Sequence, residues 1–340
     1  MTLASNVHPD GRLDPVRRVH PDVGDTLRTR RNRRDRLNVV AVVSNPCGYR
    51  RRYELAARFV ETMKRNPDVR LFVAELAYGD QPFVVTESMP DDACLRIRTD
   101  SPALWQKEAM INRVVRTKLP QDWTSFAWID ADVEFDNPTW ATDALDLMDA
   151  GFDVLQLFGY CHDLAADGSV MAVHRSSGMQ YSEDERFRLY GFDAWHPGYA
   201  WAMTREFFSR SGGLYDAGIL GSGDSVMMMS WIGLGPRSIN RESSDGFKAS
   251  VASYQSRCGE VVLGYVPGVI RHNFHGAKKN RGYEWRWKIL VRHAYDPATD
   301  VELDPETGLV VPTAACLADK SQMLDEIRGY FESRREDDGA

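Results

Sequence analysis

Residues 126–135 read FAWIDADVEF, an apolar run that ends abruptly in an Asp-x-Asp pair. The apolar residues predict a short buried strand, and the two carboxylates, Asp130 and Asp132, follow where that strand ends. In an open α/β sheet, ligands bind at the carboxyl ends of the strands. Two carboxylates at such a place are costly unless a cation or a hydrogen-bonded ligand compensates them. By itself this segment leaves open both a solvated acidic turn and a cation site.

Strand and helix patterns alternate on both sides of this stretch. A run of β-branched residues over 37–43 predicts the first strand, and apolar residues at helical spacing predict a helix over 49–65. A second strand is expected over 69–76, and Ser101-Pro102 and Asn137-Pro138 are each typical of a helix start. This rhythm predicts an α/β fold with a mostly parallel central sheet and helices on both faces.

The limits of the folded unit follow from the composition of the two ends. Residues 1–36 contain nine arginines and five aspartates but few large apolar residues, which predicts a flexible arginine-rich arm. One continuous domain is expected over 37–300, and 261–273 within it is predicted to form a pair of strands. A C-terminal extension with a helix over 301–332 and a disordered tail over 333–340 complete the expected organisation.

The composition is that of an ordinary globular protein and excludes several classes. Of the 340 residues, 43% are hydrophobic and 27% are charged, and no apolar stretch approaches the ~20 residues of a membrane span. The five cysteines are scattered without a Cys-x-x-Cys pair, which argues against a disulfide frame or a zinc site. The net charge of −7 argues against unspecific nucleic-acid binding. The N-terminus has no signal-peptide layout, so we expect a cytoplasmic protein.

Residue types suited to catalysis occur at loops and element ends in four places. They are Asp130-Ala131-Asp132, the glycine-rich stretch 212–224, the stretch 271–276 with two histidines, and Lys107-Glu108 with Asn112. Carboxylates and imidazoles together suit a moderately hard divalent ion such as Mn²⁺ or Mg²⁺. Asp224 lies among glycines at a predicted helix start, where the helix dipole favours the ionised form that a general base needs.

In this order the pieces resemble the GT-A class of metal-dependent glycosyltransferases. The closer likeness is to glycosyltransferases of bacterial and large-virus or phage genomes, on WIDADVEF at 128–135, HPGYAWAMTREFF at 196–208 and the H..HG..KNRGYEWR pattern at 272–286. The resemblance covers roughly residues 38–300. It implies a GT-A fold, which is a Rossmann-like nucleotide-diphospho-sugar transferase fold. It also implies hexosyl or other glycosyl transfer from a nucleotide-diphosphate sugar, most often a UDP-sugar, to an acceptor hydroxyl with Mn²⁺ or Mg²⁺.

The resemblance implies roles for the metal-site residues. Asp132 would bind the metal directly, and Asp130 would bind either the metal or the ribose of the donor. His272 or His275 would complete the metal shell near the diphosphate, and which of the two does so is open. Asn45, at the end of the first strand, would hold the nucleotide base or ribose.

The resemblance also implies a donor and acceptor pocket. Lys107 and Asn112 are expected to meet the donor, and Trp201 and Gly213 are expected to shape the pocket for the sugar and the acceptor. Three cationic residues are expected to neutralise the diphosphate or to close over it, namely Lys278, Lys279 and Arg281.

Asp224 is the expected catalytic base if the transfer inverts the anomeric centre. It would take the proton of the acceptor hydroxyl during in-line attack. Many members of the family have Glu-Asp here, whereas this chain has Gly223-Asp224, so Asp224 lacks an acidic neighbour in sequence. An acidic first-turn residue without a catalytic role is the alternative.

The acceptor and two alternative functions are open. Glycan, protein side chain and hydroxymethylated DNA base all offer a hydroxyl group. The arginine arm, with Arg50-Arg51-Arg52 and Lys278-Lys279, is the basis for a DNA glycosyltransferase. A catalytically silent sugar- or nucleotide-binding module is the other alternative. A sugar-1-phosphate nucleotidyltransferase is disfavoured because residues 44–49 lack the glycine-rich phosphate loop that this class needs.

Overall fold

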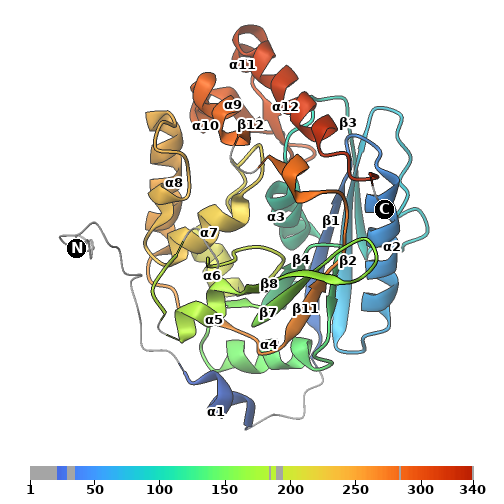
Figure 1. The fold of residues 1–340 in the computed structure, drawn as a ribbon, viewed down its shortest axis with the longest axis vertical. Coiled ribbons are helices and arrows are strands. Elements are labelled where there is room, and N and C mark those ends of the chain that lie inside the picture. Colours follow the sequence, from blue (N-terminus) through green and yellow to red (C-terminus); the bar gives the residue numbers. More distant parts are fainter. Residues whose placement is uncertain (1–20, 29–34, 184, 189–193, 283–284, 339–340) are drawn as a thin grey trace, which may run out of the picture.

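The computed structural model describes residues 21–28, 35–183, 185–188, 194–282 and 285–338. Across these ranges a seven-stranded sheet forms the centre of the molecule (Figure 1). In spatial order its strands are β10 (Leu263–Tyr265), β6 (Val154–Gln156), β9 (Ala200–Thr204), β4 (Ser125–Ile129), β1 (Leu37–Ser44), β2 (Val69–Tyr78) and β3 (Cys94–Thr99). Neighbouring strands are parallel except at β9, which is antiparallel to β4 and β6. The predicted α/β class with a mostly parallel central sheet is confirmed.

A second, four-stranded sheet takes up the chain after the Asp-x-Asp stretch. In spatial order it contains β5 (Val133–Phe135), β11 (Val269–His272), β7 (Tyr160–Leu164) and β8 (Val170–Arg175). The prediction that 261–273 forms a pair of strands is wrong. β10 pairs with β6 in the central sheet, whereas β11 pairs with β5 and β7 in the second sheet. Gly268 lies between β10 and β11 and has a φ of 145°, a conformation that glycine adopts without steric cost. The chain passes from one sheet to the other at this residue.

Helices lie on both faces of the central sheet (Figure 1). In chain order they are α1 (Val23–Arg28), α2 (Arg50–Lys64), α3 (Lys107–Thr117), α4 (Trp140–Asp149), α5 (Ser177–Ser182), α6 (Arg205–Ser211), α7 (Gly223–Trp231), α8 (Asp245–Cys258), α9 (Arg286–Arg292), α10 (Pro297–Asp300), α11 (Ala314–Asp319) and α12 (Ser321–Ser333). Two short 3₁₀ helices are η1 (Gly235–Arg237) and η2 (Lys278–Arg281), and β12 (Val301–Leu303) pairs with β13 (Val310–Pro312). No helix in the described ranges has the length and apolar character needed to cross a bilayer.

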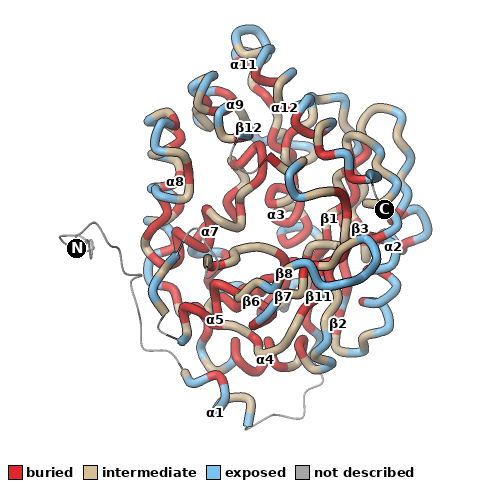
Figure 2. Tube along the Cα trace, viewed as in Figure 1, coloured by how far each residue is buried: buried red, intermediate tan, exposed pale blue. Residues whose placement is uncertain are grey.

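The central sheet is apolar on both faces because helices cover both of them. In β1, Val39, Ala41 and Val43 pack on the face covered by α2 and α4. Val40 packs on the opposite face, with Trp128 of β4 and residues of α3 and α7. Figure 2 shows the buried residues concentrated in the sheet and in the helix sides turned toward it. This two-sided burial explains why the first strand is a continuous apolar run instead of an alternating one.

The helix expected to open at Ser101-Pro102 begins only at Lys107. Tertiary hydrogen bonds hold the intervening residues in a non-helical conformation. The Trp105 N–H donates to the carbonyl of Ile219 at 2.9 Å. The Gln106 side chain bonds both the N–H and the carbonyl of Val310, at 3.0 and 2.6 Å. These long-range contacts outweigh the local N-cap preference and leave Lys107 at the start of the helix.

The N-terminal arm differs from its prediction in part. Val23–Arg28 forms α1, which packs against α4 with Val23 buried. Residues 1–20 and 29–34 of the predicted flexible arm lie outside the described residues.

The predicted disordered tail is wrong as far as residue 338. Arg334 and Glu336 are buried, and residues 339–340 lie outside the described residues. Two buried charges are tolerated because they pair with each other and because Glu336 also pairs with Arg52 of α2. The helices before this tail contribute Cys316, Met323 and Ile327 to the apolar core that also contains α3 and α7. The C-terminal residues are therefore an integral part of the fold.

Candidate functional site

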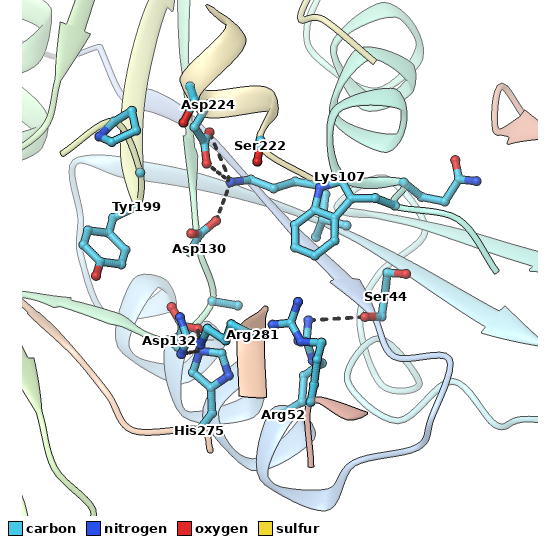
Figure 3. Close-up of a pocket in the computed structure, with 18 of the residues that line it drawn as sticks. Ser44, Arg52, Lys107, Asp130, Asp132, Tyr199, Ser222, Asp224, His275 and Arg281 are labelled. Carbon is cyan, nitrogen blue, oxygen red and sulfur yellow. Dashed lines mark hydrogen bonds and ion pairs between the residues drawn. The ribbon is translucent and has the colours of Figure 1, made fainter. Parts of the chain in front are cut away.

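A cavity of about 800 Å³ lies at the carboxyl ends of β1 and β4. It brings together segments that are far apart in sequence, from the turn after β1 to Arg334 and Glu336 near the C-terminus. Figure 3 shows charged side chains from several elements converging on it. The predicted site residues that line it are Asn45, Lys107, Asp130, Asp132, Asp224, His272, His275 and Arg281.

The Asp-x-Asp pair lies in the turn that leads from the central sheet into the second sheet. The strand before it, β4, ends at Ile129, and the Asp130 N–H donates to the carbonyl of Tyr199 at 2.8 Å. The Val133 N–H donates to the carbonyl of Asp130 at 3.3 Å, and β5 starts there. Because the chain changes sheet at this point, both carboxylates lie at the ligand-binding edge and line the cavity.

Asp132, His272 and His275 form a group that can hold a metal ion. Each side chain offers one ligand atom, and these atoms lie within 4.8 Å of one another. Asp132 Oδ2 is 3.0 Å from His275 Nε2 and 3.7 Å from His272 Nε2. The pairing of His272 with Val133 in the β5–β11 ladder brings the two segments together. Both histidines that the sequence left as alternatives therefore belong to the group.

A carboxylate lies beside the second ring nitrogen of each histidine. His272 Nδ1 is 2.6 Å from Asp163 Oδ1, and His275 Nδ1 is 3.4 Å from Glu336 Oε2. This arrangement leaves the Nε2 atoms of both rings toward Asp132. Carboxylates commonly orient metal-binding histidines in this way. Sequence reasoning missed Asp163 and Glu336, because neither stands in a recognisable motif.

The donor set fits a divalent cation. Asp132 Oδ1 is buried and has no hydrogen-bond partner among the described residues, so it has a lone pair to offer. Burial alone would raise the pKa of Asp132, but His272 and His275 outweigh burial and hold that pKa well below its ordinary value. Arg281 Nη2 donates to His275 Nε2 at 2.8 Å, and a bound cation would replace this contact.

Asp130 is not a member of this group, because Lys107 pairs it with Asp224 instead. Lys107 Nζ is 2.6 Å from Asp130 Oδ1 and 3.2 Å from Asp224 Oδ2 (Figure 3). Burial alone would lower the pKa of Lys107, but Asp130 and Asp224 outweigh burial and raise that pKa well above its ordinary value. The two carboxylates of the Asp-x-Asp pair therefore have different partners, and only Asp132 faces the histidines.

Glu108 explains why glycine precedes Asp224. It follows Lys107 on α3 and is buried, and its carboxyl group packs against the backbone of Gly223. A Cβ atom at position 223 would lie only 3.0 Å from Glu108 Cγ and closer still to the carboxyl group, so a larger side chain has no room. The acidic neighbour that Asp224 lacks in sequence is thus present in space, on another helix.

Glu108 makes the stability of the protein depend on pH. Burial raises its pKa from 4.5 to about 8. Between these values the folded state keeps a proton that the unfolded state has lost. The contribution of Glu108 to stability is therefore fully present below about pH 4.5 and is lost as the pH rises through about 8. We expect the change in the free energy of urea unfolding caused by Glu108→Gln to differ between the two pH values. Relative to wild type, the variant should gain at least about 2 kcal/mol more at pH 8.5 than at pH 5. An equal effect of the substitution at both pH values would contradict this assignment.

Two residues at the cavity adopt backbone conformations that are rare for residues other than glycine. Tyr199 has a φ of 81° and Ser222 a φ of 70°, and both line the cavity. Such strain costs about 1–3 kcal/mol per residue and clusters at functional sites. The Tyr199 ring stacks on His196 with 4.4 Å between ring centroids. Nothing in the segment 196–208 indicates a left-handed backbone, so the sequence did not reveal Tyr199 as a residue of the cavity lining.

The cavity carries more cationic side chains than the sequence indicated. Arg286 is buried and donates to the Tyr330 hydroxyl at 3.0 Å. Arg52, from the run that suggested DNA binding, points into the cavity and donates to Glu336 at 2.8 Å. The lining arginines beyond the predicted Arg281 are Arg52, Arg237, Arg286 and Arg334.

Asn112 and Gly213 form a structural contact outside the cavity lining. The Asn112 side chain accepts from the N–H of Leu214 at 2.8 Å and donates to its carbonyl at 2.9 Å. Gly213 has a φ of 108° and packs against that side chain. Asn45 does line the cavity, but its side-chain amide bonds the backbone of Tyr49 and shapes the turn after β1.

Trp201 and Lys278 also lie outside the cavity lining. Trp201 is fully buried in β9, and its Nε1 donates to the carbonyl of Pro197 at 2.8 Å, so the structure places it in the core. Lys278 pairs with Asp163, the carboxylate that holds His272. It therefore acts on the site through a neighbour and does not line the cavity.

Comparison with known proteins gives a weak likeness. No protein-family model matches the chain, and no curated protein matches it. Among solved structures, the chain is similar to a Drosophila β1,4-galactosyltransferase 7 mutant in complex with manganese, UDP-Gal and xylobiose. The TM-score is 0.30 and the identity 12%, and the match covers 68% of this chain and 65% of that chain. At this level the likeness supports no assignment of function, so the case for one rests on the geometry of the site.

Proposed function

We propose that the protein is a metal-dependent glycosyltransferase that moves a sugar from a nucleotide-diphosphate sugar, with UDP-sugars as first candidates, to an acceptor hydroxyl. One observation carries the proposal: a single cavity holds the Asp132-His272-His275 group and, beside it, the pair Asp130 and Asp224 bridged by Lys107. The first group suits a cation that binds a diphosphate. The second supplies a carboxylate for proton transfer.

The ligand types favour one of the two expected ions. A divalent cation held by Asp132, His272 and His275 would bind diphosphate oxygens and offset the charge of the leaving group. Imidazole is a softer ligand than the oxygen donors that Mg²⁺ prefers. Two imidazoles and one carboxylate therefore suit Mn²⁺ better than Mg²⁺.

The charge and size of the cavity support an anionic donor. Its cationic lining offers several donors to phosphate oxygens, and guanidinium groups match phosphate geometry well. A volume of about 800 Å³ falls within the range of ~300–1,000 Å³ typical of small-molecule sites. The cationic side chains that line it are Arg52, Lys107, Arg237, Arg281, Arg286 and Arg334.

Asp224 is the proposed base of the transfer. The acceptor oxygen bonds to the anomeric carbon while the bond from that carbon to the diphosphate breaks, and the diphosphate leaves with the electron pair. Asp224 takes the proton of the acceptor hydroxyl. Lys107 Nζ is 3.2 Å from Asp224 Oδ2 and holds that carboxylate at the cavity. Asp130 holds Lys107 in place from the other side.

The described contacts give the DNA acceptor little support. Arg50 pairs with Glu54 on its own helix, and Arg51 Nε donates to the carbonyl of Phe274 at 3.0 Å. Arg52 faces the cavity, where it donates to Glu336 of the C-terminal segment. Two of the three arginines in this run thus bond distant segments of the protein, which leaves them poorly placed to bind the phosphates of a duplex. We therefore propose an acceptor hydroxyl without naming its carrier.

A thermal-shift panel of nucleotide sugars, each with and without Mn²⁺, tests the proposal. A donor that binds only the folded state raises the unfolding free energy by ~2.7 kcal/mol at a hundredfold excess over its dissociation constant. We expect a UDP-sugar to raise the unfolding free energy only when Mn²⁺ is present. Under the same conditions we also expect slow release of UDP. No shift from any donor, or a shift that is indifferent to Mn²⁺, would contradict the proposal. Metal-dependent binding without release of UDP would instead indicate a silent binding module.

A further inference from the structure

The last described residues, 334–338, form a segment that we call the C-terminal strap. It leaves the end of α12 and lies beside the N-terminus of α2, where Figure 1 shows the end of the chain. Asp337 accepts hydrogen bonds from the N–H groups of Arg51 at 2.8 Å and Arg50 at 3.1 Å. The residue that precedes α2, Tyr49, makes no side-chain cap of its own. The strap therefore caps a helix nearly the whole chain away in sequence.

The strap also packs directly on the turn that contains the second metal-site histidine. Gly276 follows His275 and has a φ of 85°. A Cβ atom at this glycine would lie 2.9 Å from Glu336 Cα and 3.1 Å from the carbonyl oxygen of Arg335. Both the backbone conformation and the close approach require glycine here. The glycine of the His-x-x-His-Gly pattern is thus explained by contact with the strap.

Glu336 carries this contact into the metal site. Its side chain is buried between two guanidinium groups, with Oε2 2.8 Å from Arg52 Nε and Oε1 2.6 Å from Arg334 Nε. Oε2 is also 3.4 Å from His275 Nδ1, on the side of the ring opposite to the Nε2 atom that faces Asp132. Asp163 holds the corresponding position beside His272. Each histidine therefore has a carboxylate beside its Nδ1 atom, at 2.6 Å for His272 and 3.4 Å for His275, and the two carboxylates come from different parts of the chain.

We propose that the C-terminal strap completes the metal site, with Glu336 as a positioning residue that fixes the His275 ring through Nδ1. The inference rests on the proposed function, because it requires that Asp132, His272 and His275 hold a cation. The two arginines fix the carboxylate, and the carboxylate fixes the orientation and the tautomer of the imidazole. Metal affinity then depends on the strap, although none of its residues, 334–338, belongs to the ligand group.

The test is a Mn²⁺ titration of the full chain, with free Mn²⁺ measured by electron paramagnetic resonance. Glu336→Gln is expected to weaken Mn²⁺ binding by about 10–100-fold, the usual effect of losing a carboxylate behind a metal-binding histidine. Asp337→Asn is the matched control in the same strap. It weakens the cap of α2 and is expected to lower the melting temperature while leaving the Mn²⁺ affinity within about twofold.

A double-mutant cycle separates positioning from a general loss of structure. If Glu336 acts through His275, then Glu336→Gln has little further effect on Mn²⁺ affinity when it is added to His275→Ala. Unchanged affinity in Glu336→Gln, or additive losses in the cycle, would overturn the role of the strap and leave the metal site itself standing. A wild-type chain that binds no Mn²⁺ would overturn the proposed function and the role of the strap together.

Discussion

Asp132→Asn is expected to slow Mn²⁺-dependent sugar transfer by about a thousandfold or more, which corresponds to roughly 4 kcal/mol of transition-state stabilisation. Asp132 Oδ2 faces the Nε2 atoms of both His272 and His275, and it is the one anionic ligand of the group. Asparagine keeps the shape of the side chain but removes the charge. We expect the rate of UDP release at saturating Mn²⁺ to report this loss directly.

Asp136→Asn provides the matched control for Asp132→Asn. Asp136 lies just after β5, and its half-exposed carboxylate pairs with Arg271 at 3.1 Å on the surface, away from the cavity lining. Exposed ion pairs contribute little to stability, so this variant should keep wild-type activity. Activity of Asp132→Asn within tenfold of the control would show that the carboxylate is not needed for catalysis.

Lys107→Met is expected to destabilise the fold by about 3–5 kcal/mol, because it leaves the carboxylates of Asp130 and Asp224 without their shared cation. The Lys107 side chain is 13% exposed and those of Asp130 and Asp224 are 29% and 20% exposed, so solvent compensates only part of the loss. Methionine preserves most of the volume of lysine, and the effect is therefore electrostatic. Urea unfolding at neutral pH measures it.

Two further variants identify the cause of the effect of Lys107→Met. The double variant Lys107→Met/Asp224→Asn removes one of the two unpaired charges and should recover part of the lost stability. Lys118→Met, at the end of the same helix, breaks only an exposed contact with the carbonyl of Asp91 and should change stability by less than about 0.5 kcal/mol. If the double variant is no more stable than Lys107→Met alone, unpaired charge is not the cause.

Much of the fold could be predicted because local pattern and tertiary packing agree. The first strand and the Asp-x-Asp strand each bury a continuous apolar run between helices, which is typical of an inner strand in an α/β sheet. The helix after the first strand buries apolar residues at helical spacing on one side only. Prediction failed where distant contacts decide the local structure. Trp105 and Gln106 bond to Ile219 and Val310, so the helix expected at Ser101 starts later.

Only those site residues that belong to a recognisable sequence motif could be predicted. Asp132 and the two histidines were recognisable by residue type and order, and the structure brings them together. Their supporting carboxylates were not, because an isolated acidic residue such as Asp163 or Glu336 carries no pattern. The tail with Glu336 looked disordered because it is highly charged, and its order comes from pairing with Arg52 far away in sequence. Charge pairing across such a distance leaves no periodicity to read.

The separation of Asp130 from Asp132 also could not be predicted. Adjacent carboxylates in an Asp-x-Asp motif look equivalent in sequence, yet the chain turns into the second sheet between them. Asp130 then meets Lys107 while Asp132 meets the histidines. Lys107 comes from α3, which packs on the central sheet, whereas His272 comes from β11 of the second sheet. The two carboxylates have different partners for this reason.

The proposed function requires that Asp132, His272 and His275 together bind the catalytic cation. The most direct measurement is an anomalous difference map at the manganese absorption edge, from crystals grown with Mn²⁺ and UDP. We expect one strong peak within coordination distance of Asp132 and of the Nε2 atoms of His272 and His275. No peak at this group, or a peak held by Asp130 and Asp224 instead, would contradict it.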